Sequence, residues 1–157
     1  MLPQVPEVVD AMNRRILNLL QQDGRTTTAE LARRLRRSES SVRERIRRME
    51  AKGIIRGYFA CVDKRAFGYR SEAFVFCNIG PSDQAGVLEE LVRLHNVTGI
   101  FHVSGAKRFL LKVAARDNQE LRDVIHRTLI PLGIQDVESH IVMDVTEKFP
   151  PDAVVDA

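Results

Sequence analysis

Residues 25–56 read RTTTAELARRLRRSESSVRERIRRMEAKGIIR. This stretch predicts two short amphipathic helices, joined by a tight turn that carries Arg36 and Arg37. Gly53 marks the end of the second helix. The order of helix, short turn and basic helix is typical of a helix-turn-helix, which lays its second helix in the major groove of DNA.

Capping residues support both helices. Thr27 and Glu30 have the spacing of a capping box, in which the threonine hydroxyl accepts from the Glu30 amide and the Glu30 carboxylate reaches back to the cap. Ser38 is a natural N-cap for the second helix, which we expect to run to about Lys52.

The second helix has one apolar stripe, formed by Val42, Ile46 and Met49, and a polar face opposite it. Arg45 lies nearer the buried side, which favours an intraprotein salt bridge or a phosphate contact over contact with a base. The candidate DNA-binding residues are Arg36, Arg37, Ser38, Ser40, Ser41, Arg43, Arg45, Arg47 and Arg48.

Two roles are expected within this set. Arginines at the turn and the helix ends neutralise phosphates, whereas Ser40, Ser41, Arg43 and Arg47 contact base edges. The alternatives are a solvated helix face and a winged-helix-like fold that contacts proteins.

Charge is distributed unevenly along the 157 residues, whose net charge is +3. Residues 1–60 hold 13 Lys and Arg against 7 Asp and Glu, and residues 61–157 hold 11 against 14. A front half of +6 and a back half of −3 indicate that the front half meets a polyanion.

The remaining composition indicates a globular protein, with 44% hydrophobic residues. Cys61 and Cys77 lie in apolar runs and are expected to be buried and reduced. The four histidines show no metal-ligand spacing with the cysteines, so we expect no metal site. Leu2–Val9 is too short and too rich in proline for a signal peptide, and no run is long enough to span a membrane. These features predict a cytoplasmic protein.

A further helix precedes the motif. It begins near Asp10, a possible N-cap, and ends at Asp23-Gly24. Together the three helices form a unit over about residues 9–53, preceded by a loose arm at residues 1–8.

After Gly53 the pattern changes to short apolar runs. The expected order is strand, helix, strand, strand, helix, strand, with Ile54–Val62 as a β-prone entry segment. The strands are Ala73–Ile79, Val97–Ser104, Phe109–Ala115 and about 135–146, and the helices are capped by Ser82 and Asp117. This order is the split βαβ pattern of a ferredoxin-like sandwich. Helices cover one face of its sheet, and self-association would cover the other.

Four segments together resemble the Lrp/AsnC (leucine-responsive, feast/famine) family of transcription regulators. They are DAMNRRILNLLQQDGR (10–25), AELARRL (29–35), SVRERIRRMEAKGIIRGYFACVD (41–63) and VSGAKRFLLKVAARD (103–117). The similarity runs from about Val9 to Lys148. It implies an α+β chain with a three-helix, winged-helix-like helix-turn-helix domain at 1–57, a ferredoxin-like regulatory and oligomerisation (RAM) domain at 58–149 and a mobile tail at 150–157.

The resemblance also implies partners. Such proteins form homodimers through the second domain, assemble into tetramers or octamers, bind double-stranded DNA upstream of genes and respond to amino acids or related metabolites. The sequence itself has no Ser/His/Asp spacing, no phosphate-cradling glycine loop and no metal motif, so we expect no enzymatic activity, no cofactor and, without a long apolar run, no contact with a membrane.

One position departs from the family pattern Gly-x-x-Asp between the middle strands. Gly105 matches, but Arg108 stands where the aspartate is expected. A cation there repels an ammonium and favours a carboxylate, so we hypothesise an acidic effector, a different pose or no effector. A solvated hairpin tip is the plain alternative. The candidate effector residues are Ser104, Gly105, Ala106, Lys107, Arg108, Asp136, Glu138 and His140.

Two other functions fit the same architecture. Sirohaem decarboxylases share the two domains, but their tetrapyrrole motifs are rich in histidine and aromatic residues. This chain has no tryptophan, and His95 and His102 do not rebuild those motifs. The second alternative is a ligand-binding module without DNA binding, which the basic front half disfavours.

Overall fold

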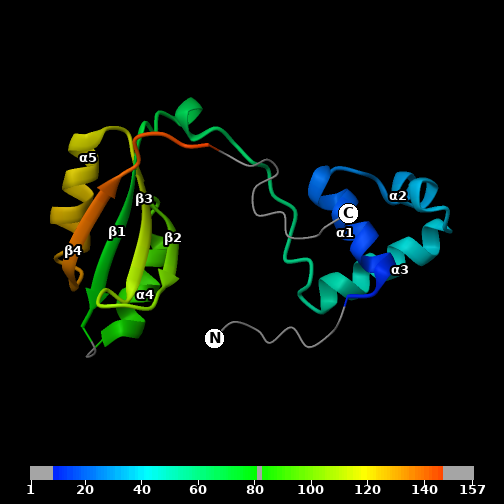
Figure 1. The fold of residues 1–157 in the computed structure, drawn as a ribbon, viewed down its shortest axis with the longest axis horizontal. Coiled ribbons are helices and arrows are strands. Elements are labelled where there is room, and N and C mark those ends of the chain that lie inside the picture. Colours follow the sequence, from blue (N-terminus) through cyan, green and yellow to red (C-terminus); the bar gives the residue numbers. More distant parts are fainter. Residues whose placement is uncertain (1–8, 81–82, 147–157) are drawn as a thin grey trace. The chain divides into compact units, whose positions relative to one another are not determined.

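The computed structural model describes residues 9–80 and 83–146 (Figure 1). Contacts within the chain define two compact units, and the boundary between them along the chain falls between Cys61 and Val62. We call residues 9–61 the helical unit and residues 62–145 the sheet unit. The predicted arm at residues 1–8, the Ser82 cap and the tail at 150–157 lie outside the described residues.

The helical unit contains α1 (Ala11–Gln22), α2 (Thr28–Leu35) and α3 (Glu39–Ala51). The three predicted N-caps are confirmed. Asp10, Thr27 and Ser38 accept hydrogen bonds from the amides of Asn13, Glu30 and Ser41, with lengths of 2.7, 3.2 and 3.4 Å. Each cap pairs an amide that the first turn of a helix leaves without an intrahelical partner.

The second half of the predicted capping box is wrong. The Glu30 carboxylate accepts from the guanidinium groups of Arg33 and Arg34 instead of reaching back to Thr27. The two guanidinium groups give the Glu30 carboxylate three hydrogen bonds, two of them a bidentate pair from Arg33, whereas the cap amide would give it one. The same bonds lower the pKa of Glu30 to about 2.

The core of the helical unit confirms the apolar stripe of α3. Val42 and Met49 are fully buried and Ile46 packs beside them. The other buried side chains of this core are Ile16, Leu31, Ala32 and Leu35. The small Ala32 at the centre of α2 leaves room for a close neighbouring helix.

The segment after α3 is not a strand, contrary to the prediction for Ile54–Val62. No residue between 54 and 62 pairs with a strand of the described chain. The amides of Ile54 and Ile55 instead donate to the carbonyl of Met49, at 2.9 and 3.2 Å, and both side chains pack against the helical core. A β-prone sequence needs a neighbouring strand to pair with, and this segment has none among the described residues.

The sheet unit confirms the predicted split βαβ order. After a short 3-10 turn, η1 (Lys64–Phe67), it contains β1 (Ser71–Ile79), α4 (Gln84–Arg93), β2 (Val97–His102), β3 (Phe109–Ala115), α5 (Asn118–Asp123), the π-helical turn η3 (Val124–Leu129) and β4 (Ile134–Ile141). The strands are antiparallel in the order β2-β3-β1-β4 (Figure 1).

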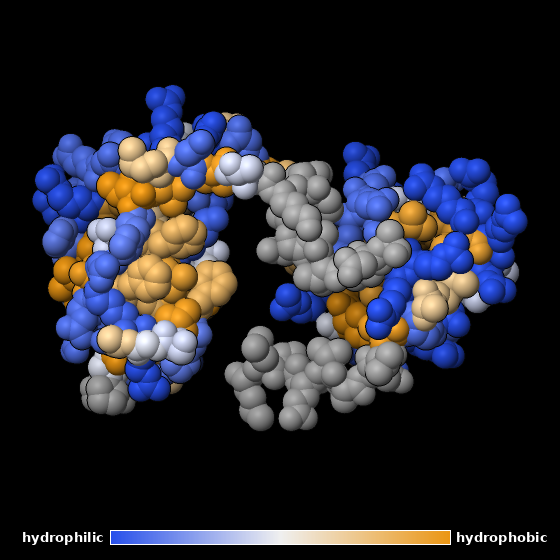
Figure 2. All heavy atoms as spheres, viewed as in Figure 1, coloured by the Kyte–Doolittle hydropathy of each residue, from blue (hydrophilic) through white to orange (hydrophobic). Residues whose placement is uncertain are grey.

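Side chains alternate across the sheet. Val75 and Cys77 on β1 and Leu111 on β3 are fully buried against the helices, together with Leu91 of α4 and Leu129 of η3. The opposite face keeps apolar side chains exposed, and Figure 2 shows them gathered over the strands. We call this second surface, made by Phe74, Phe76, Phe101 and Leu110, the open face.

Three smaller predictions for the chain are wrong. Cys61 is exposed rather than buried, because residues 56–63 around it are exposed and belong to neither core, whereas Cys77 is buried as predicted. The N-cap of α4 is Asp83, which accepts from the amide of Gly86. Finally, β4 ends at Ile141, where its pairing with Ala73 of β1 stops.

Candidate DNA interface and effector region

The exposed surface of α3 and of the turn before it carries the predicted DNA-binding residues. Eight of the nine are exposed: Arg36, Arg37, Ser38, Ser40, Ser41, Arg43, Arg47 and Arg48. They lie away from Val42 and Met49, so the helical phase expected from the sequence is correct.

Arg45 takes part in an intraprotein salt bridge, the first of the two roles expected for it. Its Nη1 donates to Oδ2 of Asp10 at 2.6 Å and to Oδ1 of Asn13 at 2.9 Å. These bonds hold the middle of α3 against the start of α1. Arg45 therefore orients the helix within the unit.

Two arginines of the exposed face are paired with glutamates one turn earlier. Arg43 bonds to Glu39, and Nε of Arg48 donates to Oε1 of Glu44 at 2.9 Å. Such exposed pairs contribute little to stability, about 0.3–0.5 kcal/mol. They do reduce the positive charge that this face offers to phosphates.

Arg36, Arg37 and Arg47 form a contrasting group. All three are exposed, and none of them has an ion pair within residues 9–80 and 83–146. Arg36 is also held in the left-handed region, with φ of 51°, at the C-cap of α2. These three cations are free to meet a polyanion without breaking an existing pair.

The serines differ in what they offer. Ser38 uses its hydroxyl oxygen to cap α3, and Oγ of Ser40 donates to it at 3.3 Å. The cap fixes where α3 begins, and so fixes how its first turn is presented. Ser41 has its backbone amide in this cap, which leaves its side chain for an outside partner.

Within the helical unit, four exposed arginines outside the predicted set carry no ion pair among the described residues. They are Arg14 and Arg15 on α1, Arg25 before α2 and Arg56 after α3. Their positive charge is visible in the sequence. They were missed because the argument from helical phase covered only the turn and the second helix of the motif.

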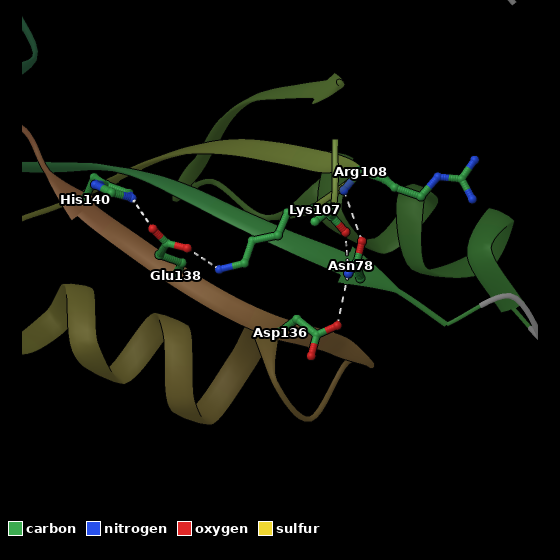
Figure 3. A network of polar contacts seen from close by, with 7 residues as sticks. Asn78, Lys107, Arg108, Asp136, Glu138 and His140 are labelled. Carbon is green, nitrogen blue, oxygen red and sulfur yellow. Dashed lines mark hydrogen bonds and ion pairs between the residues drawn. The ribbon is translucent and has the colours of Figure 1, made fainter. Parts of the chain in front are cut away.

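In the sheet unit, Asn78 connects the turn between β2 and β3 with the start of β4, the two stretches that contain the candidate effector residues (Figure 3). Its Nδ2 donates to the carbonyl of Ala106 at 3.2 Å and to Oδ2 of Asp136 at 2.9 Å. Its Oδ1 accepts from the amide of Arg108 at 3.0 Å. Sequence reasoning missed Asn78, although one polar residue near the end of an otherwise apolar strand was a usable signal.

A second chain of contacts runs along β4. Lys107 bonds to Glu138, whose Oε1 lies 2.9 Å from Nε2 of His140 (Figure 3). The bond from Lys107, supported by His140, lowers the pKa of Glu138. His140 also meets the ring of Phe76 edge-on, with centroids 5.5 Å apart. Lys107 is therefore a paired residue and not a solvated hairpin tip.

Arg108 differs from its neighbour. Its backbone is fixed by Asn78, but its side chain extends away from the network (Figure 3). It has no ion pair within the part of the chain that the structure describes. Of the two cations in this turn, Arg108 alone is available to an anion.

A cavity of about 670 Å³ lies between the helical segment α5–η3 and strand β4. Its lining combines apolar side chains, such as Leu121, Ile125 and Ile134, with the polar Arg122, His126 and Asp136. Asp136 belongs both to this cavity and to the Asn78 network, whereas Ser104 to Arg108 do not line the cavity. Of the predicted effector residues, Asp136 lines this cavity, whereas Glu138 and His140 do not and instead belong to the contacts of Lys107.

The described residues contain no group of three or more histidine, cysteine or acidic side chains placed to hold a metal ion. They also contain no helix that is both long and apolar enough to cross a membrane.

Comparison with known proteins matches both units. Residues 9–56 match the winged helix-turn-helix DNA-binding family, and residues 72–151 match the Lrp/AsnC ligand binding domain. The chain belongs to the Lrp/AsnC family of transcription regulators. Among its relatives, an uncharacterised HTH-type transcriptional regulator of Pyrococcus abyssi is 36% identical, with 87% of each chain covered.

Two proteins of Mycobacterium tuberculosis are also similar to this Lrp/AsnC chain. The HTH-type transcriptional regulator LrpA is 32% identical over 77% of this chain and 81% of its own length. The structure of the feast or famine regulatory protein complexed with L-methionine superimposes with a TM-score of 0.86. It is 27% identical and covers 95% of this chain and 100% of its own. The α+β architecture predicted from the sequence is thereby confirmed.

Proposed function

We propose that this Lrp/AsnC regulator binds specific double-stranded DNA sites through α3 and the turn before it. In this proposal the domain at 1–57 carries the DNA contacts, and the domain at 58–149 carries oligomerisation and effector binding. The observation that supports it most is the set of unpaired, exposed cations Arg36, Arg37 and Arg47 on a capped helix whose opposite side is buried.

The proposed contacts follow from the pairing pattern. Arg36 and Arg37, at the turn, neutralise phosphates and contribute affinity that does not depend on sequence. Arg47, on the outward side of α3, donates to a guanine, which is the commonest specific contact of arginine. Arg43 is paired with Glu39 and Arg48 with Glu44. These two arginines therefore add less net positive charge to the surface than two unpaired arginines would.

The decisive experiment is a selection of genomic fragments by the full-length protein, starting with the region upstream of its own gene. Selected fragments should bind tighter than random duplex of equal length at moderate ionic strength. Equal affinity for selected and random duplex would contradict sequence-specific binding. The cytoplasmic location expected from the sequence stays a prediction.

We further propose that two chains associate through the open face of the sheet. Phe74 is 37% and Phe101 50% exposed there, and burying such side chains is favourable by about 25 cal/mol per Å². Light scattering should give at least a dimer, and Phe101→Asp should shift it towards monomer. A monomeric wild type would refute this association. Tetramers or octamers would follow if dimers associate further.

An effector is the third part of the proposal. The M. tuberculosis relative is described as complexed with L-methionine. In this chain Arg108 offers an unpaired cation, so an acidic metabolite is the expected ligand. Thermal-shift assays should show stabilisation by dicarboxylates that Arg108→Ala removes. Equal stabilisation of wild type and Arg108→Ala by neutral amino acids would refute the acidic effector.

The named relatives are transcription regulators, and we propose no enzymatic activity and no cofactor for this chain. A sirohaem decarboxylase would bind a coloured tetrapyrrole. Incubating the pure protein with a tetrapyrrole and recording its absorption spectrum tests that alternative, and binding with a spectral shift would support it.

A further inference from the structure

Helix α3 carries nearly as many acids as bases. Its 13 residues include four arginines and three glutamates, so its net charge is only +1. A helix that served only to hold phosphates would gain from fewer carboxylates, because each one is repelled by the polyanion. Phosphate binding therefore does not explain why α3 carries these glutamates.

Glu44 is the acid that points most directly outward. It lies on the side of α3 opposite the buried Val42 and Met49, and Arg47, three residues later, is its neighbour on the same side. Its side chain is 55% exposed. Any duplex seated on Arg47 also meets the Glu44 carboxylate.

The carboxylate already has one partner that positions it. Nε of Arg48 donates to Oε1 of Glu44 at 2.9 Å. An ionised carboxylate offers about four acceptor positions, so Glu44 can keep Arg48 and accept a second hydrogen bond. The arginine lowers the cost of bringing a negative charge to DNA and orients the free oxygen.

The chemistry of the major groove limits what that oxygen can bind. A carboxylate only accepts hydrogen bonds, whereas guanine presents acceptors alone and thymine an acceptor and a methyl group. Cytosine N4 and adenine N6 are the donors, and glutamate is best matched to cytosine because adenine adds an acceptor at N7 beside its donor.

We propose that Glu44 is a specificity-determining residue that accepts a hydrogen bond from the N4 amino group of a cytosine, next to the base pair that Arg47 contacts. This inference rests on the proposed DNA binding by α3. Glu44 thereby lowers the affinity for DNA in general and raises the selectivity. Its carboxylate disfavours binding to every site that lacks an amino group at that position.

The test compares Glu44→Ala with Glu39→Ala in the full-length protein. The two variants are matched, because each removes one exposed carboxylate and releases the arginine one turn later. Circular dichroism first establishes that both variants are helical. Each protein is then used to select sites from a duplex library, and affinities are measured for the selected site and for its single-base variants.

Wild type and Glu39→Ala should select a cytosine at one position and bind the other bases there roughly tenfold or more weakly. Glu44→Ala should lose that preference, keep the preference at the position contacted by Arg47, and bind random duplex no worse than wild type. Unchanged preferences in Glu44→Ala, or a wild-type preference for adenine there, would overturn the role of Glu44. If wild type selects no sequence at all, the proposed function itself fails.

Discussion

Arg45 and Asp10 join α3 to the start of α1, with Nη1 of Arg45 2.6 Å from Oδ2 of Asp10. The other carboxylate oxygen of Asp10 accepts from the amide of Asn13 at 2.7 Å and caps α1. One aspartate therefore both begins the first helix and holds the helix that carries the proposed DNA contacts. The orientation of α3 depends on a residue 35 positions earlier in the chain.

Asp10→Ala should lower the free energy of unfolding by about 1–2 kcal/mol. About 1 kcal/mol comes from the N-cap, and less than about 1 from the salt bridge, because both side chains are partly exposed. Asp10→Asn is the matched control, since asparagine also caps helices but carries no charge. Urea denaturation should rank wild type, Asp10→Asn and Asp10→Ala in that order. An unchanged midpoint in Asp10→Ala would contradict both roles.

The same residue predicts a pH dependence. The Asn13 amide first, and Arg45 second, hold the pKa of Asp10 below its ordinary value. A lowered folded-state pKa stabilises the fold above the unfolded-state pKa, and this stability is lost as pH falls through the folded-state pKa. The stability difference between wild type and Asp10→Asn should thus be full near neutral pH and shrink below about pH 4. A difference that grows on acidification would have the wrong sign.

Glu30 should titrate far below an ordinary glutamate. The hydrogen bonds from Arg33 and Arg34 lower its pKa to about 2. Its carboxyl carbon, followed by NMR from neutral to acid pH, should have its midpoint near that value. Replacing both Arg33 and Arg34 by glutamine should return the midpoint to the ordinary range of glutamate, about 4.3. A midpoint near 4 in the wild type would show that these exposed pairs do not persist in solution.

Gly53→Ala should destabilise the helical unit by about 1 kcal/mol. The φ of Gly53 is +69°, and no atom lies within 4 Å of an added Cβ, so the cost is backbone strain alone. Gly24→Ala is the matched control, because Gly24 has no such φ and its Cβ would meet only a carbonyl oxygen at 3.7 Å. Its stability in urea should stay equal or rise slightly. Equal losses in both variants would contradict the explanation from φ.

Arg47→Ala and Arg36→Asn should weaken DNA binding in different ways. Loss of Arg47 should cost about 1–3 kcal/mol at one base position and leave other positions unchanged. Loss of Arg36 should weaken all sequences alike and flatten the dependence of affinity on salt. Asparagine is chosen for Arg36 because it tolerates the positive φ of 51°. Identical behaviour in binding titrations over a range of salt would refute the assignment of roles.

The two cysteines should differ strongly in reactivity. Burial raises the pKa of the Cys77 thiol to about 11, and its side chain is fully buried, whereas Cys61 is exposed. A thiol reagent should label one cysteine per chain in the native protein and two in denaturant. Cys61→Ser should abolish the native reaction, and Cys77→Ser should leave it unchanged. Rapid native labelling in Cys61→Ser would contradict the burial of Cys77.

Several features were predictable because they depend on neighbours in the chain. The caps at Asp10, Thr27 and Ser38 follow from side chains that reach an amide three residues away. The burial of Val42 and Met49 follows from helical periodicity alone. The competition for the Glu30 carboxylate was also local, but spacing did not indicate that two arginines would outcompete the cap.

By itself, the sequence determined the order of helices and strands, the ends of the three N-terminal helices and the phase of α3, because these follow from spacing along the chain. Only the tertiary structure decided which arginines remain free, since Arg45 meets a carboxylate far away in sequence. It alone brought Asn78, Ala106 and Asp136 together. Strand pairing and ion pairing depend on distances in space, so residues far apart in sequence become neighbours only after the chain has folded.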